Sequence, residues 1–353
     1  MTTERSMEGR YYRFLVPAAP DALTVRPYRE GDEQAILDLF ERAFHHRRSL
    51  ARWRWEYRDN PYGNLRISLA FDADGRLAAH YAGYPVRFWT DAGGPPRTWL
   101  AHQVGDTMTA PEARGIGRRA TSALARTLAH FYSTFCDGRI DFNYGTNTGK
   151  IQRFSRRFAN ARLLEPVPFR VRALGRPLPV PGRLALAVGG WRVEPVERWD
   201  APFDDLWRRA RGGYGLLVER DARYLAWRYG ACPDALPAYA VYRRRTLVGW
   251  SVFRRLSDER IVWGDALFDP RHPQAVPLLL DRALAAPPLA GAATLEGWLT
   301  PRPAWWDERV EDLGFEHRPE PEDLAAVYVP FRVDPGEAFA RHLYTMKGDS
   351  DLL

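Results

Sequence analysis

The residue types best suited to chemistry gather between Asp106 and Leu128, where a predicted strand runs into a glycine turn and then into a helix with an apolar face. A helix start leaves backbone N–H groups unpaired and carries partial positive charge, and glycines let a loop curl closely around an anion. Arginines add charge for a phosphate. The stretch predicts a phosphate-binding turn; from the loop alone, the alternative is an ordinary helix cap with exposed arginines. The turn reads Arg114, Gly115, Ile116, Gly117, Arg118 and Arg119.

The spacing of this turn argues against two familiar phosphate loops. It lacks Gly-x-x-x-x-Gly-Lys-Ser/Thr, the loop of nucleoside triphosphatases, and Gly-x-Gly-x-x-Gly at a first strand, which binds dinucleotides. The chain carries a net charge of +7, but nearly all of its positive charge is arginine and no long basic run occurs. An anionic small molecule is therefore the favoured partner, and nucleic acid is not expected.

Length and composition bound the class of protein. The 353 residues predict about two domains, and a hydrophobic content of 45% is enough to build packed cores. The chain has no apolar run of about 18 residues and no secretory-signal order at its start, so we expect no membrane span and a cytoplasmic location. Cys136 and Cys232 lack metal-type spacing and the histidines are scattered, which predicts no metal site.

The sequence repeats itself weakly. Trp55-Glu56-Tyr57 reappears as Trp227-Arg228-Tyr229, each followed by a proline four residues on. The pattern Asp-x-x-x-x-Pro occurs at Asp106 and again at Asp265, and each half later carries a helical segment that ends near an aromatic residue. Three matches in the same order predict a duplicated fold. A stretch rich in proline and glycine separates the halves, so we predict domains at 1–175 and 191–353 with a linker at 176–190.

Hydrophobic periodicity predicts an α+β order with many strands in the first half. Helices are expected after Asp32, which is a candidate N-cap, at 120–131 and at 150–158. Strands are expected at 23–26, 67–71, 77–89, 99–109 and 140–145.

The residues Arg114-x-x-Gly117-x-Arg119, placed after a strand and before an apolar helix, resemble motif A of the GNAT (Gcn5-related N-acetyltransferase) superfamily, Gln/Arg-x-x-Gly-x-Gly/Ala. Residues 23–44 resemble the first strand and helix of that fold. Residues 144–161 resemble its later strand and helix, with Asn147 at the customary asparagine. The chain as a whole is similar to tandem-GNAT bacterial acyltransferases, well over 22–165 and faintly over 195–335.

This resemblance implies two tandem GNAT-like domains, each a mixed, mostly antiparallel central sheet flanked by helices. It also implies acetyl-CoA as cosubstrate, with its pyrophosphate on the glycine turn and its pantetheine arm along the preceding strand. In the second half a proline follows Arg271-His272 in place of a glycine turn, so that half is not expected to bind CoA. The implied CoA-binding residues are Met108, Thr109, Arg114, Gly115, Ile116, Gly117, Arg118, Arg119, Asn147 and Ser155.

Acyl transfer to an amine needs a base for the amine and an acid for the leaving thiolate. We predict Asp106 as base or water-orienting residue, with His102 on the same face of a regular strand. The alternative is that Asp106 satisfies buried donors, as its echo Asp265 suggests. The family's usual acid falls near Phe154-Ser155, so Tyr144 is the predicted substitute, unless it is only a packed aromatic. Arg119 departs from the motif, which has glycine or alanine there.

The predicted function is therefore acyl-CoA-dependent N-acyltransfer, with acetyl as the expected acyl group. The acyl group would pass directly to the amine of a small-molecule acceptor such as an amino sugar, because neither cysteine sits in a nucleophile arrangement. Three alternatives stay open: a Fem-type aminoacyltransferase that uses charged tRNA, a CoA-binding protein without catalysis, and a protein acetyltransferase.

Overall fold

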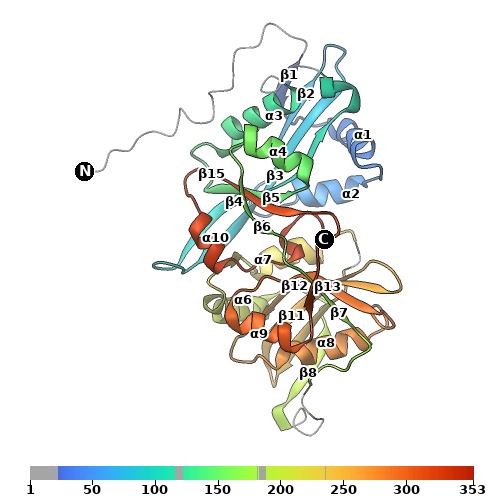
Figure 1. The fold of residues 1–353 in the computed structure, drawn as a ribbon, viewed down its shortest axis with the longest axis vertical. Coiled ribbons are helices and arrows are strands. Elements are labelled where there is room, and N and C mark those ends of the chain that lie inside the picture. The colour runs from blue at the N-terminus through green and yellow to red at the C-terminus, as the bar shows by residue number, and fades with distance from the viewer. Residues whose placement is uncertain (1–22, 116–121, 181, 183–187, 235) are drawn as a thin grey trace, which may run out of the picture. The chain divides into compact units, whose positions relative to one another are not determined.

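A computed structural model describes residues 23–115, 122–180, 182, 188–234 and 236–353 of the chain (Figure 1). By their internal contacts these residues form two compact units. The first unit comprises the chain up to Pro85, Leu100–Glu165 and Ala325–Asp334, and the second comprises Val86–Trp99, Pro166–Leu324 and Pro335–Leu353. No helix among the described residues is long and apolar enough to cross a membrane.

The sheet that carries the first unit is mixed and mostly antiparallel. Its strand order is β1-β2-β3-β4-β5-β15-β6, and β4 pairs with β5 in parallel. The short strand β9 (Leu216–Val218) pairs with the end of β3 that belongs to the second unit. The strands are β1 (Thr24–Pro27), β2 (Ile67–Phe71), β3 (Leu77–Thr90), β4 (Arg97–Thr109), β5 (Phe142–Asn147), β6 (Arg162–Pro166) and β15 (Ala325–Pro330).

The helices of the first unit follow from local sequence. In α1, Ile36, Leu39 and Phe40 are buried at helical spacing, as predicted. Asp32 precedes α1, but its carboxylate accepts from Arg26 instead of capping the helix. The helical segments are α1 (Glu33–Phe44), α2 (Leu50–Trp53) with a π-helix at Arg54–Arg58, a 3-10 helix at Pro111–Gly115, α3 (Ala123–Phe131) with a π-helix at Tyr132–Cys136, and α4 (Gly149–Phe158).

The second unit repeats this architecture around a sheet of order β14-β7-β13-β12-β11-β10-β8, in which β12 and β13 are the parallel pair. Its strands are β7 (Phe169–Ala173), β8 (Trp191–Pro195), β10 (Ala238–Arg243), β11 (Thr246–Arg255), β12 (Arg260–Phe268), β13 (Thr294–Trp298) and β14 (Glu316–His317). Its helices are α6 (Ala201–Ala210), α7 (Ala222–Leu225) with a π-helix at Ala226–Gly230, α8 (Ala275–Ala285), α9 (Ala304–Asp312) and α10 (Gly336–His342).

The predicted fold class is confirmed: both sheets are mixed, mostly antiparallel and flanked by helices (Figure 1). The compact units cross the predicted domain boundaries at three places. Val86–Trp99 lies before residue 176 but belongs to the second unit. Strand β7 also lies before residue 176 but pairs with β13, and β15 lies far beyond residue 191 but pairs with β5. Composition marks where a chain can loop, whereas strand pairing decides which sheet a strand joins. The boundaries of the two sequence halves stay a prediction.

The repeated Trp-x-Tyr motifs occupy matching elements. Each lies on a π-helix that directly follows a short α-helix, α2 in the first unit and α7 in the second. The two short helices also begin alike, because Ser49 accepts from the backbone of Arg52 and Asp221 accepts from that of Tyr224.

A buried arginine–aspartate–tyrosine triad ties each π-helix to its central strand. In the first unit the Tyr57 hydroxyl donates to Asp106 at 2.8 Å, and Arg48 Nη2 donates to the other carboxylate oxygen at 2.9 Å. In the second unit Tyr229 donates to Asp265 at 2.6 Å and Arg220 Nη2 donates at 3.0 Å. The Asp-x-x-x-x-Pro pattern at Asp106 and at Asp265 therefore marks equivalent aspartates, each held by an arginine and a tyrosine.

We predict that Arg220→Met strongly destabilises the protein. Arg220 is fully buried and serves two carboxylates, Asp265 and Asp349, which the variant would leave without their cation. Breaking such a pair costs about 3–5 kcal/mol of unfolding free energy, measurable by urea denaturation. The control is Arg76→Met, because Arg76 pairs with Asp74 at the surface and should cost under about 1 kcal/mol. Equal effects in the two variants would contradict the structural role of the triad.

Candidate functional site

Strands β4 and β5 run side by side and then separate. They pair only at Ala101 with Phe142, His102 with Asn143 and Gln103 with Tyr144 among the described residues. Beyond these pairs β4 continues to Thr109 and β5 to Asn147. The other edge of β4 stays with β3, because the amide of Ala110 donates to Ala78 O at 2.9 Å. The opened edge can therefore pair with an extended ligand, and we call this opening the β4–β5 split.

Two backbone features shape the split. Gly145 lies so close to β4 that a Cβ there would come within 2.8 Å of Val104 O, so the approach requires glycine. Asp106 has a φ of +50°, which interrupts the alternation of side chains along β4. The prediction that His102 and Asp106 share a face is therefore wrong. His102 packs against Phe131, whereas Asp106 bonds to Arg48.

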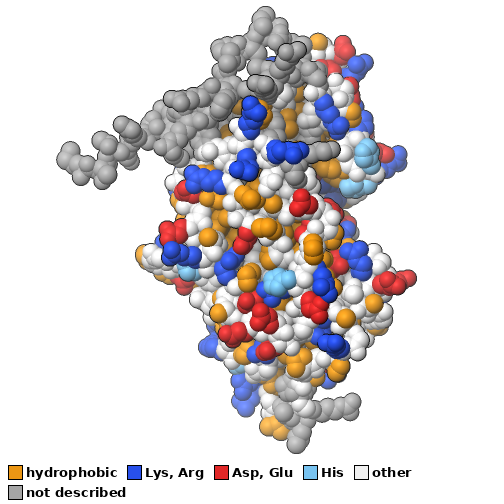
Figure 2. Space-filling model, in the orientation of Figure 1, with side chains coloured by type: hydrophobic (Ala, Val, Ile, Leu, Met, Phe, Trp, Pro, Cys, Tyr) orange, Lys and Arg blue, Asp and Glu red, His pale blue; other side chains and the backbone are white. Residues whose placement is uncertain are grey.

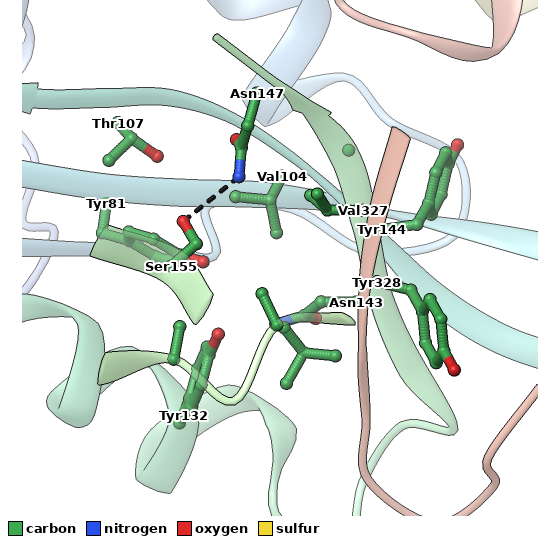
Figure 3. A pocket seen from close by; sticks show the side chains of 14 residues that line it. Tyr81, Val104, Thr107, Tyr132, Asn143, Tyr144, Asn147, Ser155, Val327 and Tyr328 are labelled. Atoms are coloured by element: carbon green, nitrogen blue, oxygen red, sulfur yellow. Dashed lines mark hydrogen bonds between the residues drawn. The ribbon is translucent and has the colours of Figure 1, made fainter. Parts of the chain in front are cut away.

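A pocket opens where the two strands separate (Figure 3). Its empty volume is about 360 Å³, including open solvent at its mouth. Thr107 of β4, Asn147 of β5 and Ser155 of α4 line it. The side-chain amide of Asn147 donates to Ser155 Oγ at 3.1 Å. The structure thus brings together two residues that the sequence predicts to hold CoA.

Two tyrosines at the inner part of the pocket were missed by sequence reasoning. Tyr81 of β3 and Tyr132, which begins the π-helix after α3, both line the pocket, and their rings meet edge to face with centroids 6.1 Å apart. In Figure 3 the Tyr132 ring points toward Tyr81 and Ser155. Burial raises the pKa of Tyr81, so this end of the pocket is uncharged. The only sequence signal was the aromatic run Phe131-Tyr132 at the end of an apolar helix.

Tyr144 points away from the part of the pocket that Asn147 and Ser155 line. It lies opposite Tyr328 of β15, and alternation along β5 places it on the other face from Asn147. Figure 3 shows both tyrosine rings together, away from Asn147 and Ser155. Its role as the acid stays a prediction, and the geometry favours the alternative of a packed aromatic.

His102 lies in a buried neutral cluster beneath the split. Its Nδ1 is 3.7 Å from Cys136 Sγ, to which the Asn143 amide donates at 3.5 Å. Burial, helped by the charge of Arg66, lowers the pKa of His102 to about 3. Burial also raises the pKa of the Cys136 thiol well above its usual range. Both groups are therefore uncharged at neutral pH, which favours a packing role for His102 over its predicted part in catalysis.

Asp106 is an ionised carboxylate whose oxygens are occupied. Burial acts to raise its pKa, but the charge of Arg48 outweighs burial and the pKa lies below its ordinary value. The Asp106 carbonyl lies 2.7 Å from His80 Nδ1, so the backbone is held as well as the side chain. Its role as base stays a prediction, and these contacts favour the structural alternative.

The predicted phosphate turn is only partly described. Arg114 is exposed on the 3-10 helix that follows β4, and the backbone of Gly115 ends that helix. Before it, Met108 is buried in β4 and Thr109 is partly exposed at its end. The residues at the centre of the turn, Ile116, Gly117, Arg118 and Arg119, lie outside the described residues. Within the described part of the chain, no three histidine, cysteine or acidic side chains cluster as metal ligands.

Comparisons with known proteins agree with this geometry. Residues 24–135 match the acetyltransferase (GNAT) domain family. No curated protein matches the sequence. A probable N-acyltransferase from Enterococcus faecalis is similar in structure, with a TM-score of 0.63 at 11% identity over 88% of this chain and 73% of that chain. A GCN5-related N-acetyltransferase from Anabaena variabilis gives 0.62 at 14% identity over 87% and 72%.

The structure is also similar, with a lower TM-score, to that of an N-myristoyltransferase. The N-myristoyltransferase of Saccharomyces cerevisiae, with bound myristoyl-CoA, gives a TM-score of 0.55 at 13% identity over 91% of this chain and 81% of that chain. Identities this low establish the fold alone. Fold and family match together place the protein among the acyltransferases. It carries a GNAT domain, as the motif resemblance predicted.

We predict that Asp106→Asn lowers stability and leaves the pH dependence of catalysis unchanged. The variant loses the charged pair with Arg48, so its unfolding free energy should fall by about 3 kcal/mol. Because the pKa of Asp106 is lower in the folded state, its stabilisation is present above about pH 4 and is lost as the pH falls through the folded pKa. Acid denaturation followed by circular dichroism tests this, with the exposed Asp74→Asn as control. Unchanged stability with abolished transfer would instead identify Asp106 as the base.

We also predict that His102 makes the protein lose stability below neutral pH. Its pKa of about 3 in the folded state lies below the unfolded value near 6.5, so the unfolded chain binds the extra proton between these limits. Stability should fall by up to about 1.4 kcal/mol per pH unit as the pH drops through this window. In His102→Asn the slope should become smaller by up to this amount, and a residual slope should remain because the pKa values of His80, His130 and His272 are shifted in the same direction. An unchanged slope would contradict a neutral His102.

Proposed function

We propose that the protein transfers an acyl group, with acetyl as the expected one, from acyl-CoA to the amine of a small-molecule acceptor such as an amino sugar. The observation that carries this proposal is the β4–β5 split, where a parallel pair ends after three residue pairs and a pocket begins. An opened strand edge beside a pocket suits an extended amide-bearing arm, which pairs with backbone groups and enters between the strands.

The residues around the split suit a CoA thioester. Asn147 and Ser155 supply a polar pair on one side of the pocket, and Thr107 supplies a hydroxyl on the opened strand. Arg114 lies exposed on the 3-10 helix that follows β4, where the predicted phosphate turn begins. These residues would hold the pantetheine arm and the start of the diphosphate, and the thioester that CoA carries would supply the activated acyl group.

For the acid that protonates the leaving thiolate, the geometry favours Tyr132 over Tyr144. Both tyrosines line the pocket, but the Tyr132 ring points toward Ser155 whereas the Tyr144 ring points away from it. A tyrosine hydroxyl still carries its proton at neutral pH, because its usual pKa is about 10, so it can act as the general acid that donates to the leaving thiolate. Direct transfer without an acyl-enzyme remains our proposal, because Cys136 is a buried neutral thiol.

We predict that the wild-type chain binds acetyl-CoA with micromolar affinity in calorimetry. Asn147→Ala should weaken binding by about fivefold to tenfold, because it removes one hydrogen-bonding side chain of the pocket. Gly117→Pro should abolish binding if the turn holds the diphosphate. The matched control is Ser133→Ala, an exposed serine of the π-helix whose hydroxyl bonds only locally, and it should bind as the wild type does.

The outcomes separate the competing functions. Binding followed by thiol release with an amine acceptor supports acyl transfer, and an amine panel that includes amino sugars and lysine peptides would identify the acceptor class. Binding without turnover of any amine would favour a CoA-binding protein without catalysis. No binding to any acyl-CoA would overturn the proposal, and charged tRNA would then be the ligand to test.

A further inference from the structure

The second unit contains a split that matches the β4–β5 split. Strands β12 and β13 pair in parallel at three positions and the ladder ends at Val262 with Glu296. Beyond it β12 runs on to Phe268 and β13 to Trp298. Asp265 follows the last paired residue of β12 by three positions, as Asp106 follows Gln103 on β4. The second unit therefore has the same opened strand pair, which we call the β12–β13 split.

The chain itself fills the β12–β13 split. Residues Tyr344–Leu353, here the tail segment, contact both of its strands. On β12, the Tyr344 hydroxyl donates to Ala266 O at 3.0 Å. Just past β13, the Thr345 amide donates to the Thr300 hydroxyl at 3.2 Å, and Lys347 Nζ lies 5.4 Å from the centre of the Trp298 ring. The tail segment thus lies across the opening.

Charge holds the tail segment at the triad. Arg220, which bonds Asp265, also donates to both carboxylate oxygens of Asp349 at 2.9 and 2.8 Å. Arg228, the central residue of the second Trp-x-Tyr motif, donates to Gly348 O at 3.1 Å and also to Ser350 O. Both arginines and the tail residues that they bond are buried. Arg220 thus binds an acidic side chain, and Arg228 binds backbone carbonyls.

The fit leaves no spare room. A Cβ on Gly348 would come within 2.3 Å of the Tyr229 hydroxyl and 2.8 Å of Asp265 Cβ. A Cβ on Gly264 of β12 would come within 2.6 Å of the Leu353 side chain. Both glycines therefore stand where strand and tail segment meet, one on each side. Met346, Asp349, Ser350 and Leu353 are all buried.

We propose that the β12–β13 split is a peptide-binding site whose resident ligand is the tail segment, so that the second unit takes an acidic peptide. The first unit presents Glu56 at the motif position of Arg228, so the two motifs differ in charge at this point. The proposed function is needed only for the statement that the two splits bind different ligands, a thioester in the β4–β5 split and a peptide in the β12–β13 split. The peptide site itself rests on the contacts of the second unit.

The test displaces the tail segment in the intact chain. Gly348→Val should raise the hydrogen-exchange rates of the amides at 344–353 at least tenfold, and the control Gly175→Ala, where a Cβ meets nothing within 4 Å, should not. A synthetic peptide of the sequence 344–353 should then bind the Gly348→Val chain with micromolar affinity in fluorescence anisotropy, but not the wild type. Its Asp349→Asn version should bind at least tenfold more weakly.

Three results would overturn the proposal: slow exchange of the tail segment in the variant, no binding of the peptide to a chain with a displaced tail, or equal binding of the Asp349→Asn peptide. If Gly348→Val fails to fold, Asp349→Asn in the intact chain replaces it, with at least tenfold faster exchange expected and unchanged exchange overturning the proposal. Each folded variant should bind one equivalent of acetyl-CoA. Binding of a second equivalent after displacement of the tail segment would show that the β12–β13 split is a thioester site and not a peptide site. Absence of acetyl-CoA binding in every chain would overturn only the proposed function.

Discussion

Two buried triads, in which an arginine and a tyrosine hold one aspartate, form the constraint on which both units depend. Each aspartate lies on a central strand three residues beyond the point where that strand leaves its parallel neighbour. In the first unit Asp106 takes a positive φ, which turns its side chain toward Arg48 and leaves the opposite face of β4 to the pocket. A buried carboxylate is tolerated there because its oxygens accept charge-assisted bonds. In both units the anchored aspartate thus lies just beyond the point where the parallel strands separate.

The triads also explain part of the excess of arginine in the chain. The net charge of +7 suggests an anionic ligand, yet several arginines bind groups within the fold. Arg48, Arg170 and Arg220 pair with aspartates, and Arg228 donates to a backbone carbonyl. On the face that Figure 2 draws, basic and acidic side chains are interspersed over the surface. Guanidinium groups suit this internal work because their planar donors serve several acceptors at once. The proposed phosphate site therefore rests on Arg114, on the 3-10 helix that follows β4, and not on the net charge of the chain.

The same architecture supports two kinds of occupant. In the first unit the split opens onto a pocket with a polar pair, Asn147 and Ser155, and an uncharged inner end. In the second unit the tail segment crosses the split and bonds to Arg220 and Arg228. A duplicated fold preserves the geometry of the opening, while side chains such as Arg228 and glycines such as Gly348 decide what fits.

Sequence alone determined the elements and the family. The helical spacing of Ile36, Leu39 and Phe40 and the apolar helix after the glycine turn are local patterns, which depend on residues close together in the chain. The positions of Asn147 and Ser155 were likewise predicted from a local motif resemblance, although the hydrogen bond between them was not. Tertiary structure alone decided three things: the return of β15 to β5, the turning of Asp106 to the other face, and the presence of Tyr81 and Tyr132 in the pocket. Each depends on contacts between residues far apart in the chain, and one positive φ is enough to reverse the face that alternation predicts.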